Sequence, residues 1–280
     1  MNKLLLILIL ILSLNAKEDL QRFNVAYMTN SMSNYSKKDL KISMNIWLKE
    51  ISKEAGYDAN MFFYDNPKDA VIDLKNNKID YISAFPLVFV KYFNETLLTD
   101  AFSGGPKNIK NTIFVILSHT NINKLKDLKN PKIGIQIYDE IMYMYIKLKL
   151  NNNTPNIKGY SKRSKIVLDL FFNKIDIAIV PLRNFLLAKE LNPQIYKKVK
   201  ILEETNINAT NFAFYRKSLN KSIQKKIFKE AKKMFSSKKG KQMMLIYKAD
   251  KIIKTKLDNL KPVKELYNKY IIFKKRFKND

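Results

Sequence analysis

Apolar residues recur along the chain with two alternating periods, one typical of helices and the other of short buried strands. From Asp39 to Ala55 the apolar side chains keep a helical spacing, and Gly56 follows where a helix would end. Short apolar runs bounded by polar residues predict strands at 23–28, 60–64, 79–84, 112–117, 132–137, 157–160, 175–180 and 211–215. This strand–helix alternation predicts an α/β protein with parallel, doubly wound sheets.

Two segments of the pattern are nearly the same. Leu74–Ser83 and Leu170–Ile179 each contain the end of an amphipathic helix, an Asn-Lys turn and an apolar strand that opens with Ile-Asp. We interpret them as equivalent elements of two α/β lobes, in which a helix leads into a buried strand. The carboxyl ends of these strands are then expected to face a shared cleft, an arrangement that commonly binds small molecules.

The clearest break in the pattern is Ser103–Pro106, which holds two of the six glycines. We interpret it as the approach to a crossover, and 211–215 as the return of the chain. The resulting prediction is a discontinuous first lobe, residues 17–107 with 209–280, and a second lobe, residues 108–208.

Residues 1–16 are typical of a secretory signal peptide, with Lys3 before an apolar run and Ala16 at its end. The run is shorter than the roughly 20 residues of a membrane-spanning helix. Periplasmic localisation follows, with an uncleaved anchor as the alternative. The absence of cysteine excludes disulfides and a lipidated cysteine.

The formal net charge of +27 comes mainly from lysine, and together with the abundant Asn and Ile it indicates A/T-rich coding and lysine spread over solvated faces. Nucleic-acid binding would favour arginine clusters with interleaved aromatics, which the sequence lacks. Residues 248–280 are basic enough to lie on an anionic membrane, but their apolar positions favour a packing face.

The order of the motifs resembles the periplasmic solute-binding proteins of phosphate/phosphonate-type ABC transporters, which have a two-lobed, transferrin-like fold. The resemblance spans roughly residues 23–250 and rests on the segments 74–86, 112–134, 165–181 and 212–242. It implies an α/β fold of two lobes, each a mostly parallel sheet flanked by helices, with a hinge between them. It also implies capture of a small ligand and delivery to a membrane permease, with no cofactor.

The chain departs from the family where the ligand is expected. Family members follow the strand equivalent to 132–137 with a Ser/Thr/Gly run that cradles a phosphonate at a helix N-terminus. This chain has Gln136, Tyr138, Asp139 and Glu140 there, and Tyr160 replaces a frequent histidine. Because two carboxylates would repel a dianion, we expect weak binding of phosphate and phosphonates and a better fit for a ligand with an amine or neutral polar group.

The candidate ligand residues are those that directly follow strand ends. Asn30, Ser31 and Ser33 follow the first strand, and the first lobe also supplies Tyr64, Asp65 and Phe85. The second lobe supplies Gln136, Tyr138, Asp139, Tyr160 and Arg183. For each residue, a solvated loop position is the alternative interpretation.

The sequence offers no catalytic or metal constellation. His119 is the only histidine and lacks a paired nucleophile or further metal ligands. Asp80 and Asp176 open strands, so we expect them to cap turns at the end opposite the cleft. Gly104-Gly105 lacks the lysine of a phosphate loop. We therefore expect neither enzyme activity nor a metal site.

Three functions remain open from the sequence. The leading one is a monomeric solute-binding protein for an ABC transporter, without nucleic acid as a partner. The alternative is a sensor module of the same fold that reports to a membrane sensor kinase or other signalling partner. The third is an exported basic protein that binds membrane or nucleic acid, which a salt titration would reveal.

Overall fold

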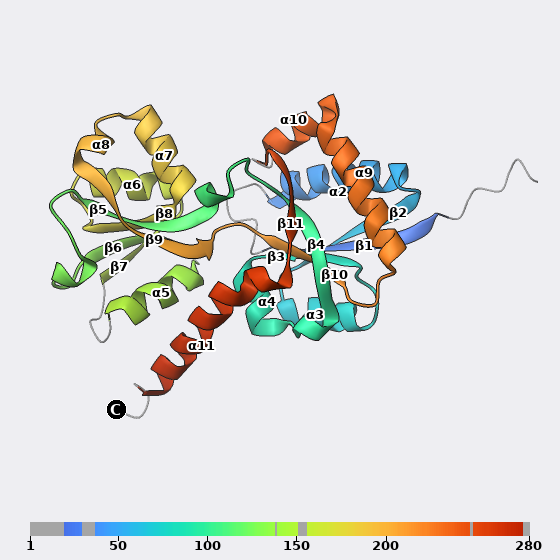
Figure 1. The fold of residues 1–280 in the computed structure, drawn as a ribbon, viewed down its shortest axis with the longest axis horizontal. Helices are drawn as coiled ribbons and strands as arrows, with labels where there is room; N and C mark the ends of the chain where they lie inside the picture. Colours follow the sequence, from blue (N-terminus) through green and yellow to red (C-terminus); the bar gives the residue numbers. More distant parts are fainter. Residues whose placement is uncertain (1–19, 30–36, 138, 151–155, 247–248, 277–280) are drawn as a thin grey trace, which may run out of the picture.

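The computed structural model describes residues 20–29, 37–137, 139–150, 156–246 and 249–276. It contains two separate sheets, one of six strands and one of five, and each is flanked by helices (Figure 1). We call the body around the six-stranded sheet the first lobe and the body around the five-stranded sheet the second lobe.

The sheet of the first lobe has the order β11-β4-β10-β3-β1-β2. Its strands are β1 (Gln21–Met28), β2 (Tyr57–Tyr64), β3 (Tyr81–Ala84), β4 (Leu98–Gly105), β10 (Phe212–Arg216) and β11 (Lys251–Thr255). Strands β1, β2 and β3 are parallel, whereas β10 pairs antiparallel with both β3 and β4, and β11 pairs antiparallel with β4.

The sheet of the second lobe has the order β7-β6-β8-β5-β9. Its strands are β5 (Ile113–His119), β6 (Lys132–Gln136), β7 (Asn156–Tyr160), β8 (Ile177–Pro181) and β9 (Val199–Asn208). Strands β6, β7 and β8 are parallel, and β5 pairs antiparallel with β8 and β9.

Helices cover both faces of each sheet. In the first lobe, α2 (Lys37–Glu54) and α9 (Lys221–Ser236) pack on the face of Phe23 and Val25, whereas α3 (Pro67–Lys75) and α4 (Pro86–Tyr92) pack on the face of Ala26 and Met28. In the second lobe, α6, α7 and α8 cover one face, and α5 and α11 cover the other. These helices are α5 (Glu140–Leu150), α6 (Arg163–Phe171), α7 (Leu182–Leu191), α8 (Ile195–Lys198) and α11 (Lys261–Arg276), and α10 (Lys238–Ile246) follows α9.

The predicted α/β class and the two helix-flanked sheets are confirmed, but the sheets are mixed rather than parallel throughout. The sequence interpretation missed β4, β9 and β11. The glycines of Ser103–Pro106 end β4 instead of forming an open break. A Cβ on Gly105 would lie 2.0 Å from Ile253 Cδ1, so glycine there allows the edge strand β11 to pack closely.

The repeated turn has the same geometry in both lobes. Asn77 and Asn173 adopt left-handed conformations with φ of 59° and 60°. The backbone N–H of the following lysine donates to the fifth residue before it, Lys78 to Asp73 and Lys174 to Asp169, each at 2.8 Å. Asparagine is among the few residues that adopt this conformation at low cost, which explains why both turns carry it.

Two short segments, 106–112 and 209–211, connect the sheets, and they lie side by side. The backbone N–H of Ala209 donates to the Thr112 carbonyl at 2.8 Å, and the Thr112 hydroxyl donates to Asn208 Oδ1 at 2.7 Å. Helix α11 also links the lobes, because its buried Val263 and Leu266 pack in the core that α5 covers. Among the residues described, we find no helix that combines the length and apolar character needed to cross a membrane.

Candidate functional site

The parallel strands of each lobe end at an edge where helices begin. In the first lobe, β2 leads to α3 and β3 leads to α4; in the second, β6, β7 and β8 lead to α5, α6 and α7. Helix N-termini carry unpaired N–H groups and a partial positive charge. These carboxyl edges are therefore where a ligand of an open α/β sheet is expected.

The first lobe brings Thr29, Tyr64 and Asp65 together at this edge. The Thr29 hydroxyl donates to Asp65 Oδ1 and also lies 3.3 Å from the Tyr64 carbonyl oxygen. Phe85 is half-buried and precedes α4, where it packs against the core. The other predicted residues from this lobe, Asn30, Ser31 and Ser33, lie outside the described residues.

Tyr64 and Tyr160 occupy equivalent places at the ends of β2 and β7. Each hydroxyl donates to an aspartate in the next helix, Tyr64 to Asp73 and Tyr160 to Asp169, both at 2.8 Å. Burial and the neighbouring carboxylate raise the pKa of both tyrosines above the ordinary value. Both hydroxyl groups therefore hydrogen-bond the end of a strand to the helix that follows it. A ligand role for either residue stays a prediction.

Asp139 stands at the N-terminus of α5, where it caps the helix. Its carbonyl oxygen accepts from the N–H groups of Met142 and Tyr143, both at 3.1 Å, and its carboxylate accepts from the Met142 N–H. The side chain is nevertheless only 11% exposed, so it does not point freely into solvent. Gln136, at the end of β6, is buried, and Tyr138 lies outside the described residues.

Arg163, the first residue of α6, is the electrostatic partner of Asp139. Its Nη2 atom lies 3.8 Å from Asp139 Oδ2, and its guanidinium stands 5.8 Å from the Phe114 ring. Burial raises the pKa of Asp139 to about 6, although Arg163 opposes this rise. Burial also lowers the pKa of Arg163, as does the nearby positive charge of Arg183. The second lobe thus has two arginines and one partly neutralised carboxylate at its carboxyl edge.

The sequence interpretation missed Arg163 while naming Asp139 and Arg183. A usable signal was present, because only five of the 52 basic residues are arginine. Arg22 and Arg276 are exposed, but Arg163 and Arg183 are partly buried, where a planar, weakly hydrated cation suits better than an ammonium. Arg216 is partly buried too, and its guanidinium pairs with Asp80 at 2.7 Å.

Among the described residues, two buried amide oxygens have no hydrogen-bond donor. They are Asn184 Oδ1, in the first turn of α7 beside Arg183, and Asn211 Oδ1, in the segment that returns the chain to the first lobe. The Asn211 side-chain N–H₂ donates to the Tyr27 hydroxyl near the end of β1. A buried acceptor without a donor costs stability, so both oxygens are places where a donor group of a ligand would be favourable.

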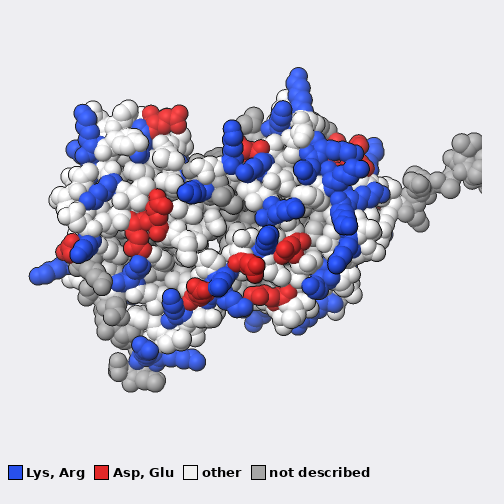
Figure 2. Space-filling model, viewed as in Figure 1, with Lys and Arg blue, Asp and Glu red and all other residues white. Residues whose placement is uncertain are grey.

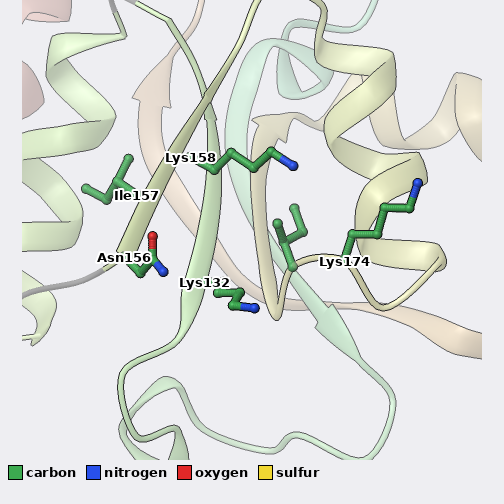
Figure 3. A pocket seen from close by; sticks show the side chains of 6 residues that line it. Lys132, Asn156, Ile157, Lys158 and Lys174 are labelled. Carbon is green, nitrogen blue, oxygen red and sulfur yellow. The ribbon is translucent and has the colours of Figure 1, made fainter.

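Two cavities lie outside the cluster of Asp139, Arg163 and Arg183. A surface pocket of about 360 Å³ sits at the opposite end of the second sheet, where Lys132, Lys158 and Lys174 surround it (Figure 3). Lys158 is paired there with Asp169 at 3.4 Å. A smaller cavity of about 90 Å³ lies beside the crossing segments and is lined in part by Asn211.

The residues weighed as catalytic candidates have structural places. As predicted, Asp80 and Asp176 cap the starts of β3 and β8: each carboxylate accepts from a backbone N–H of the neighbouring strand, that of Asn24 at 2.9 Å and that of Lys132 at 2.7 Å. His119 ends β5 and is half-buried. Within the described ranges, no group of three acidic, histidine or cysteine side chains could hold a metal ion.

Residues 31–260 match the sequence model of a family described as "ABC transporter, phosphonate, periplasmic substrate-binding protein". A search of the curated proteins finds no significant match. Among solved structures, PhnD1 from Prochlorococcus marinus in complex with methylphosphonate is similar at 15% identity with a TM-score of 0.58, covering 90% of this chain and 98% of that chain.

Two further solved structures share the architecture. A binding protein component of an ABC phosphonate transporter from Pseudomonas aeruginosa gives a TM-score of 0.58 at 14% identity, covering 91% of this chain and 88% of that chain. XAC2383 from Xanthomonas citri bound to ATP gives 0.63 at 8% identity, covering 91% and 98%. At these identities the likeness establishes the two-lobed fold.

Proposed function

Because the chain belongs to the family of periplasmic substrate-binding proteins of phosphonate ABC transporters, we propose that it captures a small anionic solute between its lobes and presents it to a membrane permease. The comparisons give no support to the alternative of a sensor module that reports to a signalling partner.

The observation that carries the proposal is the cluster of Arg163, Arg183 and Asp139. The two guanidinium groups exceed the single carboxylate in charge, and the pKa of that carboxylate is raised to about 6. Since uncompensated buried positive charge is costly, an anion that reaches Arg163 would be strongly favoured. Guanidinium groups bind phosphonate-type oxygens through paired hydrogen bonds.

Acceptor oxygens of the fold narrow the ligand class further. Asp139, Asn184 and Asn211 offer oxygen atoms, and the two amide oxygens lack donors. A ligand that carries an amine or hydroxyl beside its anionic group would satisfy them, whereas bare phosphate or a simple alkylphosphonate would not. We therefore propose a small phosphonate-like anion with a hydrogen-bond donor, held by Arg163, Arg183, Asp139 and Asn211. Tyr64, Phe85, Gln136 and Tyr160 would shape the walls, and Tyr138, Asn30 and Ser31 complete the proposed set.

Closure of the lobes would couple binding to transport. We place the hinge in segments 106–112 and 209–211, which gives lobe boundaries at 107/108 and 208/209. Helix α11 departs from these boundaries, because it follows β11 of the first lobe but packs on the second. The ion pair between Lys91 of α4 and Glu140 of α5, at 2.8 Å, already joins the two lobes beside Asp139. A ligand that contacts both lobes favours the closed form, and the closed form is what a permease can distinguish.

We also propose that the protein acts in the periplasm as a monomer after removal of residues 1–16, and that it catalyses no reaction. The family assignment supports the periplasmic site, and the structural engagement of Asp80 and Asp176 argues against a two-carboxylate hydrolase. N-terminal sequencing and light scattering of protein from native membranes and periplasm test the first two points.

Isothermal titration calorimetry with an aminoalkylphosphonate, methylphosphonate, phosphate and an alkylamine tests the ligand class. We expect an aminoalkylphosphonate to bind at least tenfold more tightly than methylphosphonate or phosphate, because only the first supplies a donor. Binding of an amine without an anionic group, and of no anion, would contradict the proposal. Equal affinity for the three anions would refute the role of the amide oxygens but would still agree with anion binding by the arginines.

A further inference from the structure

Helix α9 separates its apolar and charged residues sharply. Ile227, Ala231 and Phe235 are buried on the side that faces the first lobe. The outer side exposes six lysines, and blue side chains gather over this helix in Figure 2. They are Lys221, Lys225, Lys226, Lys229, Lys232 and Lys233.

Four of these lysines form one line along the helix. Lys221, Lys225, Lys229 and Lys232 are spaced by four, four and three residues, so they lie above one another on a single stripe about 16 Å long. Like charges at this spacing repel one another and destabilise a helix slightly. The stripe therefore destabilises the isolated protein slightly, and an anionic partner would relieve this repulsion.

Negative charge does little to balance this stripe. The only acidic residue of α9 is Glu230, which is buried and paired with Lys233 at 2.8 Å. In the part of the chain that the structure describes, no carboxylate forms an ion pair with Lys221, Lys225 or Lys229. The face is thus a net source of positive potential.

The stripe continues onto the neighbouring edge strand. Lys232 of α9 and Lys254 of β11 stand on the ring of Phe228, each 5.9 Å from its centroid. Strand β11 is the outer strand of the first sheet and also exposes Lys251. We define the α9 basic face as the four stripe lysines together with Lys251 and Lys254.

We propose that the α9 basic face docks the first lobe on an anionic lipid surface. A straight row of ammonium groups on a rigid, laterally packed helix matches a flat, diffuse layer of negative charge. Lysine is a point charge that suits a diffuse anionic layer, and the face contains no arginine, whose planar guanidinium would pair with the edges of bases. Aromatic rings that would stack on bases are also missing, except for the half-buried Phe228, so nucleic acid is the weaker fit.

The geometry also fixes the kind of attachment. The apolar side of α9 is already buried against the lobe, so the helix has no face to insert among acyl chains. Attachment is therefore electrostatic and reversible, and each lysine near the surface changes binding by about fivefold at low salt. The four stripe lysines lie on α9, which is not one of the helices that begin at the carboxyl edges, and attachment through them does not depend on the ligand.

Co-sedimentation with vesicles tests this surface. We expect the protein to bind vesicles of phosphatidylcholine mixed with phosphatidylglycerol and to dissociate from them at high salt, which screens the charges. It should not bind vesicles of pure phosphatidylcholine. The variant Lys221→Gln, Lys225→Gln, Lys229→Gln should lose at least tenfold in vesicle binding. A matched control changes the exposed Lys129, Lys174 and Lys197 of the second lobe to glutamine, which removes the same charge elsewhere.

The outcomes separate the explanations. Loss in the α9 variant with retention in the control supports the docking face. Equal loss in both would show that binding follows net charge alone and would overturn the proposal. Binding of heparin or DNA without binding of the mixed vesicles would overturn it too. Thermal unfolding of both variants checks that these exposed substitutions leave the fold intact.

Discussion

Arg163 Nη2 lies 3.8 Å from Asp139 Oδ2, and the side chains are only 12% and 11% exposed. The distance is longer than a hydrogen bond, so the carboxylate neutralises the guanidinium without occupying its donors. A ligand anion can therefore approach Arg163, but it must do so against the charge of Asp139. This relationship sets the affinity and pH dependence that we expect of the cleft.

Removing the charge of Asp139 should strengthen anion binding. We expect Asp139→Asn and Asp139→Ser to bind methylphosphonate about tenfold more tightly than the wild type in calorimetry, because the repulsion disappears while Asn or Ser still caps α5. Glu190→Gln is the matched control, since it removes an exposed negative charge from the same lobe. Weaker binding of methylphosphonate by the Asp139 variants would contradict the repulsion between this carboxylate and the anion. Tight binding of methylphosphonate by the wild type would show that the family's ligand is retained.

The pKa of Asp139 predicts how anion affinity depends on pH. As the pH falls through about 6, the carboxyl becomes protonated and Arg163 loses its competitor. The wild-type affinity for methylphosphonate should then approach that of Asp139→Asn. The ratio of the two affinities is the quantity to measure, because the titration of the ligand cancels in it. A ratio that stays constant from about pH 5 to pH 8 would contradict the assignment.

The same group should make stability depend on pH. The pKa of Asp139 in the fold, about 6, exceeds that of an aspartate in the unfolded chain, so the protonated form is favoured by folding. This contribution is fully present below about pH 4 and is lost as the pH rises through about 6, a change of about 3 kcal/mol. Urea unfolding of the wild type and Asp139→Asn at both ends of this range isolates the contribution. Parallel curves for the two proteins would exclude it.

Arg163 should be required for anion binding. We expect Arg163→Gln to weaken binding of an aminoalkylphosphonate between tenfold and a hundredfold, because a charge-assisted hydrogen bond contributes about 1.5–3 kcal/mol. The neighbouring Lys162→Gln removes an exposed positive charge and should change affinity little. Similar losses in both variants would indicate general electrostatic attraction instead of a contact.

Asp80 and Asp176 occupy equivalent positions but differ in their partners. Asp80 pairs with Arg216 at 2.7 Å in a largely buried site, whereas Asp176 caps a backbone N–H of β6. Asp80→Ala should therefore destabilise the fold by about 3 kcal/mol and Asp176→Ala by about 1 kcal/mol. Denaturant unfolding measures both, and equal losses would show that Arg216 finds solvent or another partner when Asp80 is removed.

The paired asparagines of the two turns give a further test. Because Asn77 and Asn173 have positive φ, replacing either with alanine should cost about 1 kcal/mol. Glycine should be neutral or slightly stabilising at position 173 but destabilising at position 77, because Asn77 Oδ1 accepts from Arg216 Nη1 at 2.8 Å. Thermal unfolding of the four single variants measures this. An alanine variant as stable as the wild type would mean that the turn relaxes to another conformation.

The repeat was the most informative feature of the sequence. Its Asn-Lys-Ile-Asp letters predicted a helix end, a turn and a strand start, and the structure shows the same hydrogen bonds at Lys78 and Lys174. Such features are local: a helix keeps its spacing and a turn its asparagine wherever the segment lies in the fold. The two-lobed α/β class followed from the same local patterns.

The direction of the strands and the charged residues of the site could not be predicted from local sequence patterns. Strands β9 and β11 are irregular in hydrophobicity, and the antiparallel position of β10 depends on where the chain returns between β3 and β4. Arg163 stands in a basic run, Lys162-Arg163, whose two members look alike until the fold buries one of them beside Asp139. The helices, strands and turns are predictable from the sequence, because they depend on neighbours along the chain. The pairing of distant strands and the desolvation of particular charged side chains are visible only in the folded protein, because both depend on groups that come into contact after folding.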